Sequence, residues 1–151
     1  MPYPTGFEQE TLELINRARA DPAGEYDALV TAAAADANIA NNLRYFGTDL
    51  EAFQQQIAGL PAVAPLAWNT SLAQASQTHT AQMIAADVQS HQLPGEAGLR
   101  ERVEDAGYTG LRSIGENIFA FTQNAVFGHF GFYVDWGLLA EYPTTHNRVN
   151  D

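Results

Sequence analysis

The 151-residue sequence contains no cysteine and no lysine. Without cysteine it cannot form a disulfide framework, a cysteine-based zinc site or a cysteine nucleophile, so packing must stabilise the fold. Seven arginines stand against 18 acidic residues, and the net charge of -11 excludes a general binder of nucleic acid or of an anionic membrane surface. No apolar run approaches the ~20 residues of a transmembrane helix, and residues 1–6 show no signal-peptide pattern.

The apolar content suits one domain. At 46% hydrophobic residues, a chain of this length should bury roughly two-thirds of the surface that it exposes when unfolded. Thr5 and Glu8 have the spacing of a capping box before a helix expected over 7–20. Thr48 and Glu51 have the same spacing before a second helix that Gly59 closes.

The best helical pattern follows Asn69, a favourable N-cap, and fades near residues 87–90. A shorter helix is expected over 96–106, with Gly107 in the left-handed conformation that ends it. The alanine-rich stretch 28–40 favours helix but offers little to pack. Residues 113–121 suit a strand start or a strand-to-helix turn, and 125–140 form a buried aromatic element.

Two of the four histidines differ in setting. His79 lies on the apolar face of the helix after Asn69, where a histidine is more often a hydrogen-bonded core residue than a ligand. His91 follows the same helix in a loop beside Pro94 and Gly95. Loops commonly present functional side chains, although an isolated loop histidine is usually only solvated.

Glu116 interrupts an apolar stretch that runs from Ile114 to Phe121. An unpaired carboxylate is costly to bury there, so it needs a partner. The possible partners are an arginine, a protonated histidine, backbone amides or a bound metal. Two histidines with one or two carboxylates make an acceptable set for Zn²⁺ or a similar ion, but the irregular spacing favours none of these partners. The familiar hydrolase, phosphate-loop and calcium-loop motifs are absent from the sequence.

Several segments, in order, resemble the CAP superfamily (SCP/PR-1-like proteins) in its bacterial branch. Each segment is weakly specific alone, but together they span nearly the whole chain. They are Leu14-Ile15-Asn16 with Arg19, Pro65-Leu66-Ala67-Trp68-Asn69 with Leu72, His79, Met83, Ser90-His91, Gly115-Glu116-Asn117-Ile118, Trp136 and His146.

The resemblance implies an α+β fold, an α-β-α sandwich with a central antiparallel sheet and a large cleft. It also implies two histidines and two acidic residues that hold a divalent cation, Zn²⁺ or Ca²⁺. His91 and Glu116 match two of these ligands. His146 matches the second histidine by its order in the chain, and His129, in a Gly-His-Phe segment, is the alternative.

The fourth ligand has no match, because Leu139 stands where eukaryotic members have a glutamate. Glu141 and Asp135 lie nearby in the sequence and could replace that glutamate, but neither belongs to a family motif. Three protein ligands and a water would still form an open metal site.

The resemblance also bears on domain organisation. We expect one CAP domain over 1–151 that contains a helical insertion at 28–60 and lacks its last strands, because relatives continue beyond the segment around His146. An unfilled sheet edge would favour aggregation. Relatives are exported proteins, so an extracellular location is implied.

For function, the resemblance implies a non-enzymatic module that binds an apolar or amphiphilic ligand, such as a lipid or sterol, or an extracellular protein. The alternative is a metal-assisted, peptidase-like hydrolase in which Glu116 acts as general base on a water held by His91 and His146. A third possibility is an adhesion domain with a vestigial cation site. Because one fold can host all three functions, only the residues of the site can distinguish them.

Overall fold

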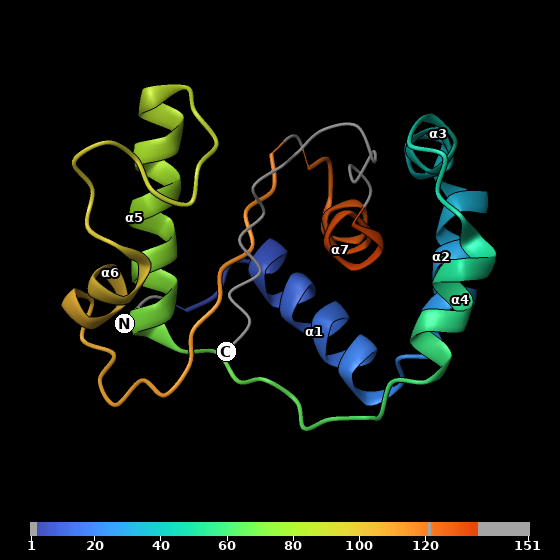
Figure 1. Ribbon diagram of the computed structural model, residues 1–151, viewed down its shortest axis with the longest axis horizontal. Coiled ribbons are helices and arrows are strands. Elements are labelled where there is room, and N and C mark those ends of the chain that lie inside the picture. The colour runs from blue at the N-terminus through green and yellow to red at the C-terminus, as the bar shows by residue number, and fades with distance from the viewer. Residues whose placement is uncertain (1–2, 121, 136–151) are drawn as a thin grey trace. The chain divides into compact units, whose positions relative to one another are not determined.

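The computed structural model describes residues 3–120 and 122–135, and the regular elements of these residues are seven helices (Figure 1). In chain order they are α1 (Gly6–Ala20), α2 (Glu25–Ala35), α3 (Ala37–Tyr45), α4 (Leu50–Ala58), α5 (Thr70–Ala86), α6 (Leu99–Asp105) and α7 (Ala125–Val134).

Two helices begin as the sequence predicts. At α1, Thr5 accepts a hydrogen bond from the amide of Glu8 at 3.2 Å, and the Glu8 carboxylate accepts one from the amide of Thr5 at 2.7 Å. At α5, the Asn69 side chain accepts from the amides of Ser71 and Leu72 at 3.0 and 3.1 Å. These bonds satisfy amides that have no partner within the helix, which fixes both starting points.

Two other local predictions are wrong in detail. Asp49, not Thr48, caps α4, because its carboxylate accepts from the amide of Ala52 at 2.9 Å. The helix expected over 96–106 spans only Leu99–Asp105. The residues expected to form its first turn lie outside the helix, because the Glu96 carboxylate forms hydrogen bonds with the Leu93 amide and the His79 ring instead.

The predicted α+β sandwich with a central antiparallel sheet is also wrong: within 3–120 and 122–135 the chain forms helices and no strand. Strands need a neighbouring strand to complete their hydrogen bonds. Residues 113–120 have the composition of a strand, but no other described segment pairs with them. One of their carbonyl groups instead accepts a hydrogen bond from a side chain: the Gln89 side-chain amide donates to the oxygen of Ile118 at 3.3 Å.

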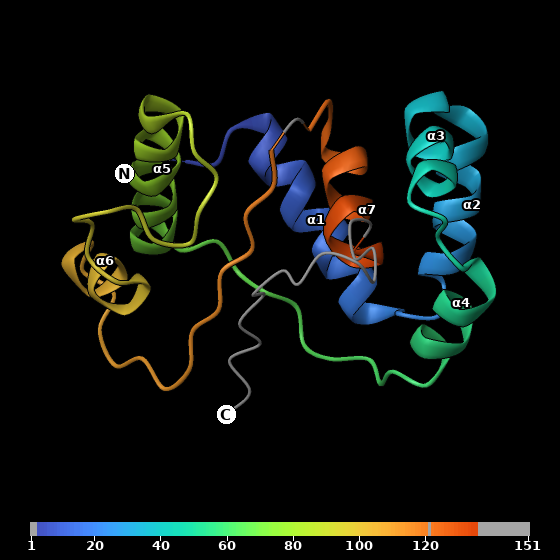
Figure 2. The same cartoon turned by 45° about the horizontal axis from the view of Figure 1, so that its top comes forward.

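The described residues divide into two compact units. We call residue 3 with 68–120 the α5–α6 unit, and 4–67 with 122–135 the five-helix unit. In the five-helix unit α1 runs beside α7, α2 contacts α3 and α4, and α3 also contacts α7 (Figure 2). None of the described helices is long and apolar enough to cross a membrane.

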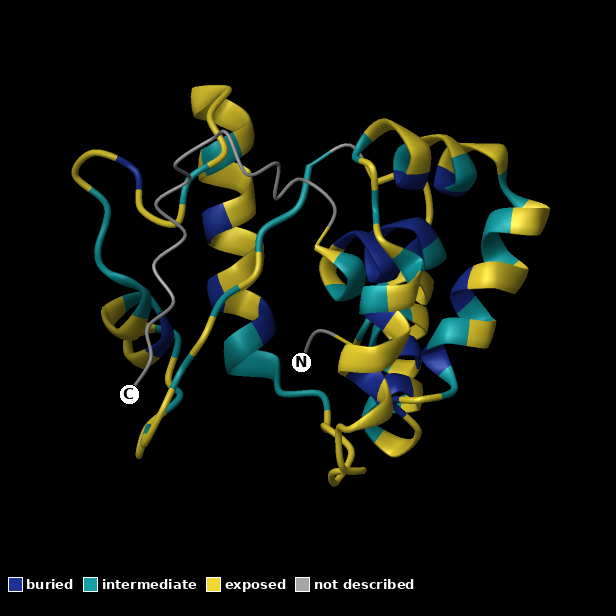
Figure 3. Cartoon of the chain, turned by 45° about the vertical axis from the view of Figure 1, so that its right-hand side comes forward, coloured by how far each residue is buried: buried dark blue, intermediate teal, exposed yellow. Residues whose placement is uncertain are grey.

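Burial differs between the longest helix and the last one. Six of the ten residues of α7 are buried, whereas α5 buries three of seventeen (Figure 3). Helix α7 approaches its neighbours closely: at Gly128 a Cβ atom would stand 2.8 Å from the Thr122 hydroxyl. Side chains on α7 are therefore held by packing on several sides, and those on α5 mostly face solvent.

Candidate functional site

The candidate site lies in the α5–α6 unit, where two helices and two connecting segments bring five charged or ionisable side chains together. Helix α5 contributes His79, and the following loop contributes His91 and Glu96. Helix α6 contributes Arg102, and the segment after it contributes Glu116.

His79 fixes the loop to helix α5. Its ring is 1% exposed. Nδ1 lies 2.7 Å from a carboxylate oxygen of Glu96, and Nε2 lies 2.9 Å from the carbonyl oxygen of Ser90. Both ring nitrogens are therefore engaged, one by a side chain and one by the backbone. His79 is thus the hydrogen-bonded core residue that the helical pattern favoured.

Glu96 is the buried anion of this arrangement. Burial alone would raise the pKa of its carboxyl. The hydrogen bond from the Leu93 amide, the bond to His79 and the charge of Arg102 outweigh that effect and hold the pKa below its ordinary value. The charged form of Glu96 is therefore stabilised by the cluster around it.

The partners of Glu116 include an arginine and a histidine, two of the kinds that the sequence allowed. Arg102 Nη2 donates to both carboxylate oxygens, at 3.1 and 3.3 Å. His91 Nδ1 lies 3.0 Å from Oε2 of the same carboxylate. The side chains of Glu116 and Arg102 are 13% and 8% exposed, whereas that of His91 is 58% exposed. His91 is therefore the member of this group that solvent reaches most easily.

Arg102 also joins the two acidic residues. Its Nη2 donates to the backbone carbonyl of His91 at 3.0 Å, and its Nε lies 3.8 Å from Glu96. That Nε is buried without a hydrogen-bond partner. One guanidinium thus neutralises Glu116, faces Glu96 and holds the backbone beside His91.

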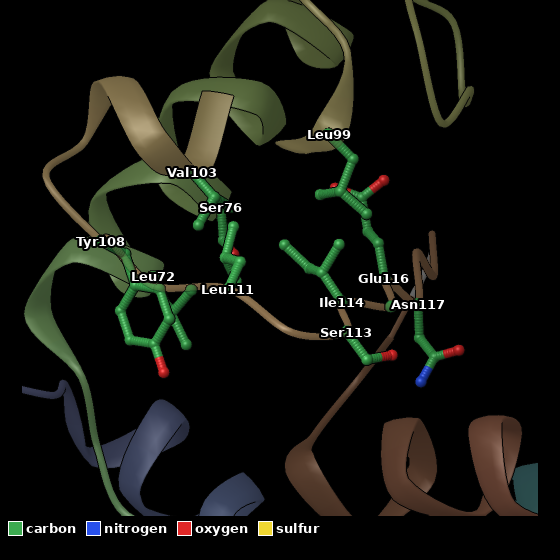
Figure 4. Close-up of a pocket in the computed structure, with 11 residues that line it drawn as sticks. Leu72, Ser76, Leu99, Val103, Tyr108, Leu111, Ser113, Ile114, Glu116 and Asn117 are labelled. Carbon is green, nitrogen blue, oxygen red and sulfur yellow. The ribbon is translucent and has the colours of Figure 1, made fainter. Parts of the chain in front are cut away.

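A cavity of about 370 Å³ adjoins Glu116. Its lining combines six apolar or aromatic residues with four polar ones and a glycine. Figure 4 shows Tyr108 and Leu72 toward one end, and Glu116 and Asn117 toward the other. The lining residues are Leu72, Ser76, Leu99, Val103, Tyr108, Leu111, Ser113, Ile114, Gly115, Glu116 and Asn117. Apolar side chains beside polar groups suit a small molecule that has both an apolar and a polar part.

The five-helix unit holds a further histidine–glutamate pair. His129 Nε2 lies 2.8 Å from Glu25, and both side chains are almost fully buried. Arg17 donates to both oxygens of Glu25, at 2.6 and 3.0 Å. Burial opposes ionisation of Glu25, but the bonds from His129 and Arg17 prevail and lower its pKa. The hydrogen bond to Glu25 in turn raises the pKa of Arg17.

Tyr133 completes this second cluster. Its ring stacks on His129, with centroids 5.6 Å apart, and its hydroxyl is buried without a hydrogen-bond partner. Burial raises the pKa of Tyr133, and the carboxylates of Glu25 and Asp21 raise it further. The neutral phenol is therefore the favoured form.

The structure thus brings together two of the predicted ligands, His91 and Glu116. It pairs His129 with Glu25 instead. His146 and Glu141 lie outside the described residues, so their roles remain predictions. Sequence reasoning did not single out Arg102 or Glu96. An arginine was one of the partners expected for Glu116, but nothing in the spacing selects Arg102 from the seven arginines.

The fit to a metal ion is partial. A carboxylate oxygen and an imidazole nitrogen 3.0 Å apart are close enough for both to contact one ion. Among the residues that the structure describes, no three histidine, cysteine or acidic groups are placed to hold a metal. Arg102 also occupies both oxygens of Glu116. His91 and Glu116 would supply at most two ligands, and a zinc site needs at least three protein ligands.

Comparison with known proteins gives one match. The family model for CAP, the cysteine-rich secretory protein family, matches residues 12–128, well over half of the chain. No curated protein and no solved structure matches the chain.

Proposed function

The chain belongs to the cysteine-rich secretory protein (CAP) family, and we propose that it is a non-enzymatic binding module for an apolar or amphiphilic small molecule. The observation that carries this proposal is the cavity beside α5 and α6, which is lined by both apolar and polar side chains, Glu116 among them. An alkyl chain or ring system would fill the apolar part. A polar head group would lie beside Glu116 and Asn117.

A divalent cation, Zn²⁺ or Ca²⁺, belongs to the same proposal. His91 and Glu116 would hold it, with His146 as the predicted third ligand and Glu141 as the less favoured alternative. The 3.0 Å separation of His91 and Glu116 supports the first two assignments. The cation would supply positive charge for an anionic or hydroxylated head group. Membership of a family described as secretory also supports an extracellular location, and an extracellular protein is the alternative partner.

The competing proposal, a metal-assisted hydrolase, requires Glu116 to accept a proton from water. Both oxygens of Glu116 already accept bonds from Arg102, and one also faces His91. This carboxylate is thus engaged in charge pairing, and the geometry favours binding over catalysis. The hydrolase would be favoured instead if the wild type hydrolysed a peptide or ester and Glu116→Gln lost this activity while it retained the fold.

A fluorescent fatty acid titrated into the full chain tests the binding proposal. Ser76 is an exposed residue of α5 that lines the cavity, so Ser76→Trp would fill the cavity at little cost to folding. Ala81, exposed on the same helix and not part of the lining, provides the matched control Ala81→Trp.

We expect saturable binding by the wild type and by Ala81→Trp, and affinity reduced at least about tenfold in Ser76→Trp, since a filled cavity cannot bury the alkyl chain. Wild-type protein that binds no probe, or equal binding by both tryptophan variants, would contradict the proposal.

A further inference from the structure

One wall of the cavity is a single continuous segment, residues 113–117, which we call the wall segment. It supplies five of the eleven lining residues, and Figure 4 shows Ser113, Ile114 and Glu116 on the same side of the cavity. The wall segment lies in neither a helix nor a strand. Among the residues that the structure describes, its backbone has no hydrogen-bond partner. Side chains must therefore hold it in place.

Glu116 is the anchor of the wall segment. Its carboxylate accepts hydrogen bonds from Arg102 Nη2 at 3.1 and 3.3 Å and lies 3.0 Å from His91 Nδ1. The next fixed point lies just outside the segment, at Ile118, whose carbonyl accepts a bond from the exposed Gln89 side chain at 3.3 Å. Water competes for a bond at such an exposed position, whereas the pair of Arg102 and Glu116 is mostly buried. Most of the attachment thus depends on Glu116.

The other side of this contact is fixed. Arg102 lies in α6, and its Nη2 also donates to the backbone carbonyl of His91 at 3.0 Å. The loop that contains His91 is joined to α5, since the buried His79 ring bonds the Ser90 carbonyl at 2.9 Å and the Glu96 carboxylate at 2.7 Å. One guanidinium therefore connects the wall segment to a part of the unit that has hydrogen bonds of its own.

Loss of this contact should act locally. Without Arg102, the Glu116 carboxylate would be mostly buried with one positive partner fewer, which is costly. The wall segment has no backbone ladder to break, so it can move outward and carry the carboxylate into water. Local openings of this kind cost less free energy than unfolding of the whole domain. The expected result is a cavity that has lost one wall, within a unit that is still folded.

We propose that Arg102 is a positioning residue for the cavity: through Glu116 it holds the wall segment closed, and it thereby determines how long a ligand stays bound. This inference rests on the proposed binding function. A wall that is already in place does not have to be ordered when the ligand binds, and preorganisation of this kind raises affinity. A ligand also leaves more slowly when a closed wall must first open.

Limited digestion with trypsin tests the position of the wall segment without any ligand. The chain contains no lysine, and the bond between Arg112 and Ser113, both exposed, lies at the start of the segment. Cleavage after Arg100, inside α6, reports unfolding of the unit as a whole. The ratio of the first cleavage rate to the second, measured by mass spectrometry, therefore reports local opening.

The variants change the contact from both of its sides. Arg102→Met keeps an extended side chain but removes the contact, and Arg102→Lys keeps the charge. Glu116→Gln weakens the same contact from the wall segment and covers a failure of the methionine variant to fold. The matched control is Glu104→Gln, since Glu104 is exposed on α6, pairs with Arg100 at 3.4 Å and changes the net charge equally.

We expect the cleavage ratio to rise at least about fivefold in Arg102→Met and in Glu116→Gln. It should stay unchanged in Glu104→Gln, and Arg102→Lys should lie between the methionine variant and the wild type.

An uncharged fluorescent long-chain alcohol then measures the effect on the cavity, because loss of the guanidinium charge does not directly change its attraction. Its dissociation from the full chain should be at least about fivefold faster in Arg102→Met than in the wild type. Arg102→Lys should restore part of the difference.

The outcomes separate the two proposals. An unchanged cleavage ratio in both Arg102→Met and Glu116→Gln would overturn the role of Arg102. A raised ratio with unchanged dissociation of the alcohol would overturn the claim that the wall segment retains the ligand. A wild type that binds neither the alcohol nor the fatty acid would overturn the proposed binding function, and the cleavage ratio would still decide whether Arg102 holds the wall segment.

Discussion

Two sets of three side chains in this molecule each contain one histidine, one glutamate and one arginine: His129, Glu25 and Arg17 in the five-helix unit, and His91, Glu116 and Arg102, which are part of the five-residue site, in the α5–α6 unit. In the five-helix unit, His129 and Glu25 are 3% and 1% exposed, and Arg17 reaches them from the surface with 45% of its side chain exposed. In the α5–α6 unit the arginine and glutamate are mostly buried, and the histidine, His91, is open. The chemistry is shared, but the two clusters expose different members.

The exposed member decides what a ligand in solution meets. At Glu25 it meets a guanidinium that already donates to both carboxylate oxygens. At Glu116 it meets an imidazole beside a carboxylate, next to a cavity with apolar and polar lining. This difference favours a stabilising role for the first cluster and supports the binding proposal for the second. The following experiments test that division.

The largest effect is expected for His129→Ala. This substitution opens a cavity beside Tyr133 and removes a buried partner of Glu25, so it should lower the free energy of unfolding by about 3–5 kcal/mol. The same change at His91, an exposed residue, should cost no more than about 0.5 kcal/mol. Urea unfolding followed by circular dichroism measures both. Similar losses for the two variants would remove the distinction between the clusters.

A smaller effect is expected from acid. The pKa of Glu25 is lowered on folding, so its charged form contributes stability above the unfolded value, near the ordinary 4.5. That contribution is lost as the pH falls below this value and through the folded pKa. The wild type should lose up to about 1.4 kcal/mol per pH unit there from this one group.

Glu25→Gln provides the comparison for the acid experiment. Its free energy of unfolding should depend less on pH between about 5 and 3, because the titrating group is gone. Parallel curves for the wild type and the variant in that range would show that Glu25 does not contribute to the acid response.

The smallest effect is expected for Arg17→Lys. Lysine keeps the charge but cannot donate two hydrogen bonds in the planar geometry of a guanidinium. Because the arginine is partly exposed, we expect a loss of only about 0.5–1 kcal/mol in the same urea experiment. Arg44→Lys on α3, an exposed arginine that bonds Asn41 and its own helix, should change stability by less. A larger loss at Arg44 than at Arg17 would argue against the importance of the Glu25 cluster.

Sequence reasoning succeeded where structure depends on near neighbours. The starts of α1 and α5 were predicted because Thr5 and Asn69 bond amides two or three residues away. The start of α4 was missed by one residue, since Thr48 and Asp49 are both good caps and the spacing to Glu51 favoured the wrong one. Local patterns identify a helix, but two adjacent candidates leave its first residue open.

Long-range features were predicted less well. The central sheet came from the resemblance alone, and a strand-like composition at 113–120 cannot specify a partner. In the site, the resemblance selected His91 and Glu116, which the structure places in contact. Arg102 lies 14 residues from Glu116 in the chain and on another element, so no spacing rule relates them. Partners of buried charges are chosen by the tertiary fold, which the sequence does not display.

Gly128 has no side chain, and this affects the position of His129, the residue that follows it. Any side chain at this position would push against Thr122, whose hydroxyl bonds the carbonyl of Asn124, the residue that caps α7. Either the Thr122 side chain rotates away and gives up that bond, or the first turn of α7 shifts and moves His129 with it. The substitution Gly128→Ala therefore tests whether the Glu25 cluster depends on close packing between the start of α7 and the segment before it.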